Sequence, residues 1–322
     1  MVNEDVAGPP LWERRLRFVL GKGGAGKSTV SAALGLAEAR AGKTVLMAEV
    51  AGQHRIARLF GVTQLGVEEE TELAPGLFAI SIDPERATEE YLSGQLKIRP
   101  LVEMLTRSKA FHTFAAAAPG LPELVTVGKV WSLAIALDAA GAPVWDTVIV
   151  DCPATGHGVA LLETAGNVEE LAAGGPIRDQ AARIHEVVSH PAATGIVVVA
   201  RPEELAVSEA IEAVALLRDR GLPVAATVLN GVREERFSAD DEERLEAVAG
   251  ASAGAVRSAA RAALRHRAHQ VADAGYHERL AAEGGVPVIA LPEVVRRRFD
   301  VGALEILAEH LAVHTGAPVS AA

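Results

Sequence analysis

The sequence predicts an α/β fold with a doubly wound, mostly parallel sheet and helical subdomain insertions. The first observation is a series of short apolar runs without polar alternation, which is typical of parallel strands buried on both faces. The second observation is that longer helical stretches separate these runs, as in repeated βαβ units. Strands are expected in seven places, namely 17–21, 44–50, 77–83, 147–151, 195–200, 225–230 and 287–292.

The 322 residues are expected to form one domain with two helical additions. The intervals at about 84–144 and 158–193 are too long for simple crossovers, and unstructured loops of that length are rare. We therefore expect helices there, on the side of the sheet where the strands end. The whole division is a disordered lead at 1–14, one domain at 15–314 and a flexible tail at 315–322.

Composition narrows the functional class. The formal net charge of −11 argues against a general nucleic-acid-binding surface. Cys152 is the sole cysteine, so no internal disulfide or paired-cysteine zinc site is expected, and a cytoplasmic location is consistent with this. The sequence contains no run of about 18 apolar residues, so no integral membrane segment is expected. Peripheral association with a membrane stays open.

The stretch GKGGAGKST, residues 21–29, fits a phosphate-binding loop. Gly21, Gly26, Lys27 and Ser28 fill every fixed position of G-x-x-x-x-G-K-[ST], between a predicted strand and a predicted helix. Such a loop turns backbone N–H groups and a helix N-terminus toward phosphates. ATP or ADP with Mg²⁺ is therefore the expected ligand. The predicted contact residues are Gly23, Gly24, Ala25, Gly26, Lys27, Ser28 and Thr29, with Ser28 on the metal.

Lys22 adds a second lysine to this loop. The run KGGAGKS resembles the deviant Walker A loop of the signature-lysine P-loop ATPases, which include partitioning ATPases, the arsenite-pump ATPase and the tail-anchored-protein targeting factor. In that class the early lysine reaches the nucleotide of the other subunit. The resemblance therefore implies a dimer in which Lys22 acts across the interface. The alternative is an exposed lysine without a partner.

The run VIVDCPATGHG, residues 148–158, narrows the resemblance. An apolar strand ends in Asp151, which matches the carboxylate that holds Mg²⁺ in this class. The following TGH is similar to a run found in the arsenite-pump and tail-anchor branch, the anion-transporting ATPase family. Asp151 would then share the metal with Ser28. A simple strand-end cap is the alternative for Asp151.

Two later segments complete the resemblance. TVLNGV, residues 227–232, resembles the strand whose asparagine reads adenine, which implies that role for Asn230. A turn asparagine before Gly231 is the alternative. VPVIALPEVVRR, residues 286–297, resembles the last strand and the loop closing over the base, which implies that Pro292 contacts the nucleotide.

The second predicted strand departs from the family. The aspartate that positions the attacking water is replaced by Ala51, which cannot orient water or accept a proton. Glu49 lies two residues earlier on the same strand face and is the expected substitute. Gln53 and His54 are further candidates. We therefore expect an ATP hydrolase that is slow alone, similar to the paired ATPases of actinobacteria.

Three uses follow from the resemblance. The first is a dimerising ATPase that couples nucleotide state to the binding of a protein client. The second is a regulatory subunit in a heterodimer with a related ATPase, and the third is a partitioning-type ATPase acting on a surface. Residues 101–125 would line a client groove or form a lid packed on itself. The sequence names neither the client nor whether the dimer is homomeric or heteromeric.

Overall fold

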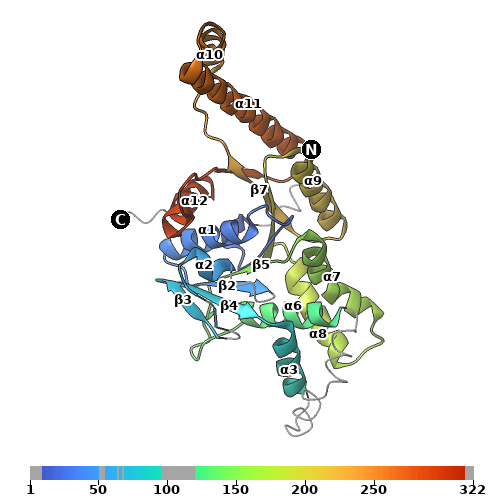
Figure 1. Ribbon diagram of the computed structural model, residues 1–322. Coiled ribbons are helices and arrows are strands. Elements are labelled where there is room, and N and C mark those ends of the chain that lie inside the picture. Colours follow the sequence, from blue (N-terminus) through green and yellow to red (C-terminus); the bar gives the residue numbers. More distant parts are fainter. Residues whose placement is uncertain (1–8, 51–54, 64, 67–68, 96–119, 316–322) are drawn as a thin grey trace.

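A computed structural model describes residues 9–50, 55–63, 65–66, 69–95 and 120–315, and its centre is an eight-stranded sheet. The strands are β1 (Leu16–Gly21), β2 (Val45–Val50), β3 (Thr71–Ala74), β4 (Leu77–Ile82), β5 (Thr147–Asp151), β6 (Thr194–Ala200), β7 (Val224–Val232) and β8 (Val288–Pro292). Their order in the sheet is β3-β4-β2-β5-β1-β6-β7-β8 (Figure 1). Only the pair β3–β4 is antiparallel among these described strands, so the predicted fold class is confirmed.

All seven predicted strands are present with small shifts at their ends. The prediction missed β3, an edge strand that pairs with β4 through an irregular register. Its sequence, TELA, has no continuous apolar run, and its residues are only partly buried or exposed. The buried strands were predicted from unbroken apolar runs, and a short antiparallel edge strand such as β3 has no such run in its sequence.

Helices cover both faces of the sheet. They are α1 (Lys27–Arg40), α2 (Arg55–Leu59), α3 (Pro84–Gln95), α6 (Leu121–Ala134), α7 (Thr155–Leu171), α8 (Pro176–Ser189), α9 (Glu204–Asp219), α10 (Ala239–Ala251), α11 (Gly254–Glu283) and α12 (Val301–Thr315). Helix α1 packs against α12 and α2 on one face. Helices α6 to α9 pack over the other face, and α3 packs against α6 (Figure 1).

Strand β1 shows how the sheet separates two cores. Phe18 and Leu20 enter the core beneath α6 to α9, whereas Val19 enters the core beneath α1 and α12. All three side chains are fully buried. This arrangement places the end of β1 in the middle of the sheet, between β5 and β6. Loops that follow the central strands therefore meet at one edge, where sheets of this type bind ligands.

Part of the segment predicted to be a disordered lead has regular structure. Leu11–Glu13 form a short 3-10 helix inside the expected disordered lead at 1–14. Leu11 is buried and belongs to the core beneath α1. Arg14 is also buried, and its guanidinium donates to the carbonyl of Thr194. Burial of one apolar side chain and this hydrogen bond hold the segment against the sheet. Residues 316–322 of the predicted tail lie outside the described residues.

A buried ion pair connects the start of β1 to the end of α1. Arg17 and Glu38 are in direct contact, and Thr147 donates a hydrogen bond to the Glu38 carboxylate at 2.7 Å. Burial, with a smaller effect of the nearby Arg14 charge, lowers the pKa of Arg17 to about 9. Removing one partner would leave a buried charge uncompensated. The pair therefore fixes β1, α1 and β5 together at the edge opposite the phosphate loop.

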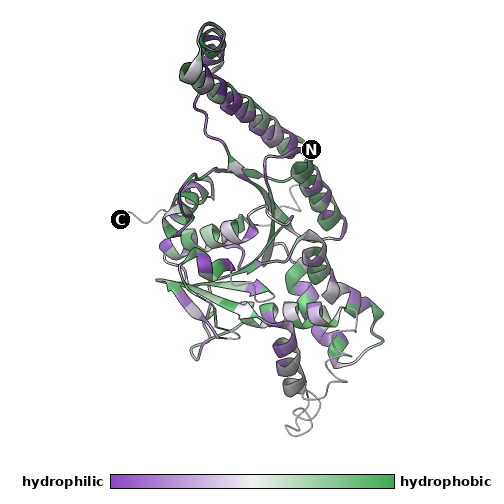
Figure 2. Cartoon of the chain, viewed as in Figure 1, coloured by the Kyte–Doolittle hydropathy of each residue, from purple (hydrophilic) through white to green (hydrophobic). Residues whose placement is uncertain are grey.

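Helices α10 and α11 form an arm that projects from the body (Figure 1). No residue of α10 is buried, and Figure 2 shows many hydrophilic residues along the arm, whereas the strands of the sheet are mostly hydrophobic. A capping box formed by Ser238 and Asp241 starts α10. Within the described part of the chain, no helix is both long enough and apolar enough to span a bilayer.

Candidate functional site

The loop after β1 has an open anion cradle. Gly24 and Gly26 adopt left-handed backbone conformations, with φ of 85° and 95°. A Cβ on Gly26 would lie 2.1 Å from the side-chain nitrogen of Asn230, so only glycine fits that position. Gly23 and Gly24 are exposed, and a Cβ on either would meet nothing within 4 Å. Among the described residues, none therefore fills the space beside these two glycines.

Helix α1 begins directly after this cradle. The first intrahelical hydrogen bond runs from the N–H of Val30 to the carbonyl of Gly26, at 2.9 Å. No side chain caps the start of the helix. The N–H groups of Lys27, Ser28 and Thr29 thus precede the regular bonding of the helix and are available to an anion. This is the geometry that the sequence pattern predicted for the loop.

Lys27 lies back against its own loop. Its Nζ donates to the carbonyl of Gly21 at 3.0 Å and to that of Lys22 at 3.3 Å. The residue is buried, and burial lowers its pKa, an effect that the charge of Asp151 opposes. Carbonyl oxygens are weak partners for an ammonium compared with a phosphate. Lys27 is therefore poised to exchange these contacts for a charged ligand.

Ser28 and Asp151 meet although 123 residues separate them. The Ser28 hydroxyl donates to Oδ2 of Asp151 at 2.5 Å. The second carboxylate oxygen of Asp151, Oδ1, is buried and has no hydrogen-bond partner among the described residues. Burial raises the pKa of Asp151 to about 6, and the neighbouring Glu49 adds to this, while the Ser28 hydrogen bond opposes it. An unpaired oxygen in such a place indicates a position for a ligand.

Glu49 provides a second acidic group beside Asp151. The two residues are paired in register between β2 and β5. Glu49 is buried, and its Oε1 accepts from the N–H of Arg55 at 2.8 Å. Its Oε2 has no hydrogen-bond partner within the described part of the chain. Glu49, the predicted substitute for the aspartate replaced by Ala51, therefore lies next to Asp151, the predicted metal ligand. Ala51, Gln53 and His54 lie outside the described residues.

The residues present fit a Mg²⁺ ion. A hydroxyl from Ser28 and an unpartnered carboxylate oxygen from Asp151 are hard oxygen ligands, which Mg²⁺ prefers. Mg²⁺ is usually held by one or two protein ligands together with phosphate oxygens. Among the described residues there is no cluster of three or more histidines, cysteines or acidic residues of the kind that holds a metal without a substrate. The donor set thus suits a metal that arrives with a phosphate.

Asn230 is held against the loop. At the end of β7, its side-chain amide donates to the carbonyl of Ala25 at 2.9 Å, and the residue is largely buried. Its predicted role in reading adenine stays a prediction, because this donor bond supports the loop instead. Pro292 ends the adjacent β8, opposite Val232 of β7, and is partly buried. Both residues lie at strand ends on the same edge as the loop.

Lys22 points to a partner within its own chain. Its Nζ lies 2.6 Å from Oε1 of Glu209 on α9, and both side chains are substantially exposed. The sequence contained no signal for Glu209, because only the fold brings α9 to the loop.

Arg55 is a second residue near the loop that the sequence pattern did not reveal. Burial lowers the pKa of Lys27, and the Arg55 charge adds to this effect. Burial raises the pKa of Asp151, and the Arg55 charge opposes that effect. In the sequence, Arg55 could have been noticed only as a basic residue soon after the second predicted strand.

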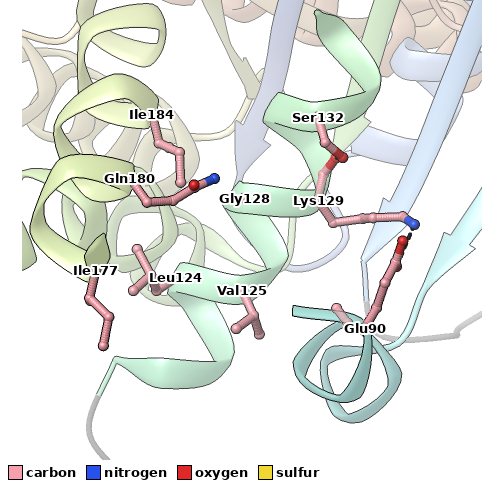
Figure 3. Close-up of a pocket in the computed structure, with 10 residues that line it drawn as sticks. Glu90, Leu124, Val125, Gly128, Lys129, Ser132, Ile177, Gln180 and Ile184 are labelled. Atoms are coloured by element: carbon pink, nitrogen blue, oxygen red, sulfur yellow. Dashed lines mark hydrogen bonds and ion pairs between the residues drawn. The ribbon is translucent and has the colours of Figure 1, made fainter. Parts of the chain in front are cut away.

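A cavity of about 300 Å³ lies among the helices α3, α6 and α8 (Figure 3). Its walls include the apolar side chains of Leu124, Val125 and Ile184. Glu90 and Lys129 form an ion pair at one side, with 2.6 Å between Oε2 and Nζ. The cavity is separate from the phosphate loop and belongs to the helical part of the molecule. Most of the predicted groove at 101–125 lies outside the described residues.

Comparisons with known proteins identify relatives of this site. Residues 14–173 match the anion-transporting ATPase family. The chain is 36% identical to ATPase BagA of Mycobacterium tuberculosis over 67% of this chain and 64% of that protein. It is 29% identical to an arsenical pump-driving ATPase of Escherichia coli, over 70% of this chain and 40% of that protein.

A third relative is ATPase GET3B of Arabidopsis thaliana, which is 25% identical over 71% of this chain and 66% of that protein. The family match covers β1 through α7, and so includes the phosphate loop, Glu49 and Asp151. The chain spans about 64% of the length of the first mycobacterial relatives that it matches.

Proposed function

We propose that the chain binds Mg·ATP at the loop after β1. The proposal is supported by the match of residues 14–173 to the anion-transporting ATPase family and by the similarity of the chain to arsenical pump-driving and GET3 ATPases. The observation that carries the proposal is the contact between Ser28 and Asp151 beside an open loop. The N–H groups at the start of α1 receive the phosphates, and Lys27 neutralises their charge. Asn230 and Pro292 border the base.

Ser28 and Asp151 are the residues that would hold Mg²⁺. When bound, Mg²⁺ neutralises charge on the β- and γ-phosphate oxygens. Asp151 must be ionised to take part, and Ser28 must direct a lone pair of its oxygen toward the ligand. Glu49, which is in register with Asp151, is then the carboxylate proposed to orient water, through its Oε2.

Binding at this site is tested by calorimetric titration of the full chain with Mg·ADP and with a non-hydrolysable ATP analogue. Wild-type protein should bind both ligands, and Lys27→Ala should weaken binding by at least about tenfold, because it removes a charged hydrogen bond to phosphate. Arg261→Ala on the exposed arm serves as the matched control and should bind like wild type. Equal binding by the Lys27→Ala protein would reject the site.

Hydrolysis by one subunit alone is proposed to be slow. Ala51 occupies the position at which the family resemblance expects a water-directing aspartate. Glu49 is buried, and its Oε1 already accepts a hydrogen bond from the N–H of Arg55, so only its Oε2 is open to a water. Slow hydrolysis prolongs the ATP-bound state, which suits a nucleotide-controlled switch.

Dimerisation through Lys22 is the third part of the proposal. Within the described part of the chain, Lys22 forms an exposed ion pair with Glu209, and such a pair contributes little to stability. Lys22 can therefore leave Glu209 and reach the phosphates of a second subunit with little loss of free energy. Nucleotide binding would thereby favour a closed pair of subunits and change the affinity for a protein client. The client would bind to the helices around α6 and α8.

Sedimentation velocity with Mg·ADP and a transition-state analogue of phosphate tests this pairing. Glu209→Gln frees Lys22 and should strengthen the nucleotide-dependent association, whereas Lys22→Gln should abolish it. Glu212→Gln, on the same helix, is the control and should change neither. A homodimer would be excluded if wild type and Glu209→Gln both keep the sedimentation coefficient of a monomer at all protein concentrations.

A second candidate function is that of a regulatory subunit that pairs with a related ATPase. Ala51 favours it, because such a subunit needs nucleotide binding and Lys22 but not its own water-directing aspartate. Mixing the chain with a purified related ATPase should then accelerate phosphate release beyond the sum of the separate rates. A simple sum excludes this function. No observation on the described residues favours a surface-bound partitioning ATPase.

A further inference from the structure

Arg55 is placed at the edge of the phosphate site by its own backbone. It begins α2, and its N–H donates to Oε1 of Glu49 at 2.8 Å. Glu49 is in register with Asp151, whose Oδ2 accepts from Ser28 of the phosphate loop. A chain of two contacts and one strand pairing thus connects the first residue of α2 to the loop. The position of Arg55 is therefore fixed relative to the place where the phosphates would lie.

The side chain of Arg55 is available. The residue is exposed, and its guanidinium has no hydrogen bond or ion pair with any described residue. Its charge nevertheless adds to the burial that lowers the pKa of Lys27 and opposes the burial that raises the pKa of Asp151. The guanidinium therefore lies within electrostatic range of both groups while its own donors stay uncommitted.

The charge balance of the site favours another cation. Two formal positive charges, on Lys27 and Arg55, face two carboxylates, on Glu49 and Asp151. Lys22 is held away by Glu209. A third phosphate adds one negative charge relative to ADP, even with Mg²⁺ present, and Arg55 is the exposed cation whose charge already reaches the loop. A guanidinium matches phosphate oxygens with two parallel donors.

We propose that Arg55 binds the terminal phosphate of ATP in the same subunit and makes the site select a nucleoside triphosphate over a diphosphate. This inference rests on the proposed nucleotide site and specifies which ligand state that site prefers. In a subunit that lacks the water-directing aspartate, a cation at the terminal phosphate favours retention of ATP over turnover. Arg55 is thus a specificity residue, which the sequence pattern did not reveal.

The test compares affinities for two ligands in full-length protein with Mg²⁺. Calorimetry would measure the Kd of ADP and of β,γ-imido-ATP for wild type, Arg55→Ala and Arg55→Lys. The Arg55→Ala change should weaken binding of the triphosphate analogue on the order of tenfold, because one charged hydrogen bond is lost, and that of ADP less than about twofold. Arg55→Lys should restore part of the difference, since it keeps the charge but not the planar fork.

Arg58→Ala is the matched control, because Arg58 is an exposed arginine on the same short helix. It should leave the ratio of the two Kd values unchanged. Equal losses for both ligands in Arg55→Ala, or no loss in either, would overturn the proposal for Arg55 while leaving the nucleotide site intact. Failure of wild type to bind either ligand would instead reject the nucleotide site itself, and this proposal with it.

Discussion

At the residue scale, Asp151 concentrates the chemistry of the site. It is buried, hydrogen-bonded to Ser28 through one oxygen, and unpartnered through the other. Its pKa of about 6 exceeds the ordinary value of 3.8 because burial disfavours the ionised form. The contribution of this carboxyl to stability is therefore fully present below pH 3.8 and is lost as the pH rises through 6. A cation at Oδ1 reverses this penalty.

The pH dependence of ligand binding follows from that pKa. Below pH 6 a proton occupies Asp151 and must leave before Mg²⁺ binds, so affinity for Mg·ADP should fall about tenfold per pH unit there and level off above about pH 7. Asp151→Asn should bind Mg·ADP weakly, and its affinity should depend less on pH. Subtracting its pH curve from that of wild type removes the effect of titration of the nucleotide itself. Calorimetry from about pH 5 to 8 makes the comparison. Parallel curves would show that Asp151 does not titrate in this process.

Residues tied to local motifs were predictable, and residues joined only by the fold were not. Lys27, Ser28 and Asp151 each stand in a recognisable run, and the resemblance of these runs to those of known ATPases was enough to group them in one site. Arg55 and Glu209 stand in no such run. Their proximity to the loop depends on the placement of α2 and α9, which arises from packing over long sequence separations.

At the element scale, the turn from β1 into α1 sets the geometry of the site. Gly26 has φ of 95° and lies against Asn230 of β7, which in turn supports the loop carbonyl of Ala25. The strands were predictable because buried parallel strands read as unbroken apolar runs. Edge strand β3 and the use of Asn230 as a support for the loop were not, because both depend on contacts between distant segments.

Gly26→Ala tests the importance of this turn. Alanine would have to adopt the left-handed backbone of this position, and its methyl group would displace Asn230. The free energy of unfolding should therefore fall by about 1–3 kcal/mol. Chemical denaturation of the purified protein without added nucleotide measures this. Gly23→Ala is the control, since its added methyl group meets nothing within 4 Å, and its stability should stay within about 0.5 kcal/mol of wild type. Equal stability of the two variants would contradict the packing described for the loop.

At the scale of the whole molecule, we propose that the chain combines a phosphate-binding site with a hydrolytic site that lacks its water-directing aspartate. The parallel sheet brings the loop, Ser28, Asp151 and Glu49 to one edge, while Ala51 replaces the residue expected to direct water. Lys22 and Glu209 form an exposed ion pair, and we propose that Lys22 leaves it to reach a second subunit. Such a subunit is expected to hold ATP for long periods and to depend on a partner for turnover.

The most direct test is single-turnover hydrolysis, with the purified chain in excess over radiolabelled Mg·ATP and no other protein present. The predicted result is that ATP binds and remains mostly intact for minutes, with a rate constant of about 10⁻³ s⁻¹ or below, as for unassisted P-loop enzymes. Hydrolysis at about 1 s⁻¹ or faster, in the range of ordinary enzymes, would contradict the claim that this subunit binds ATP but does not turn it over efficiently alone.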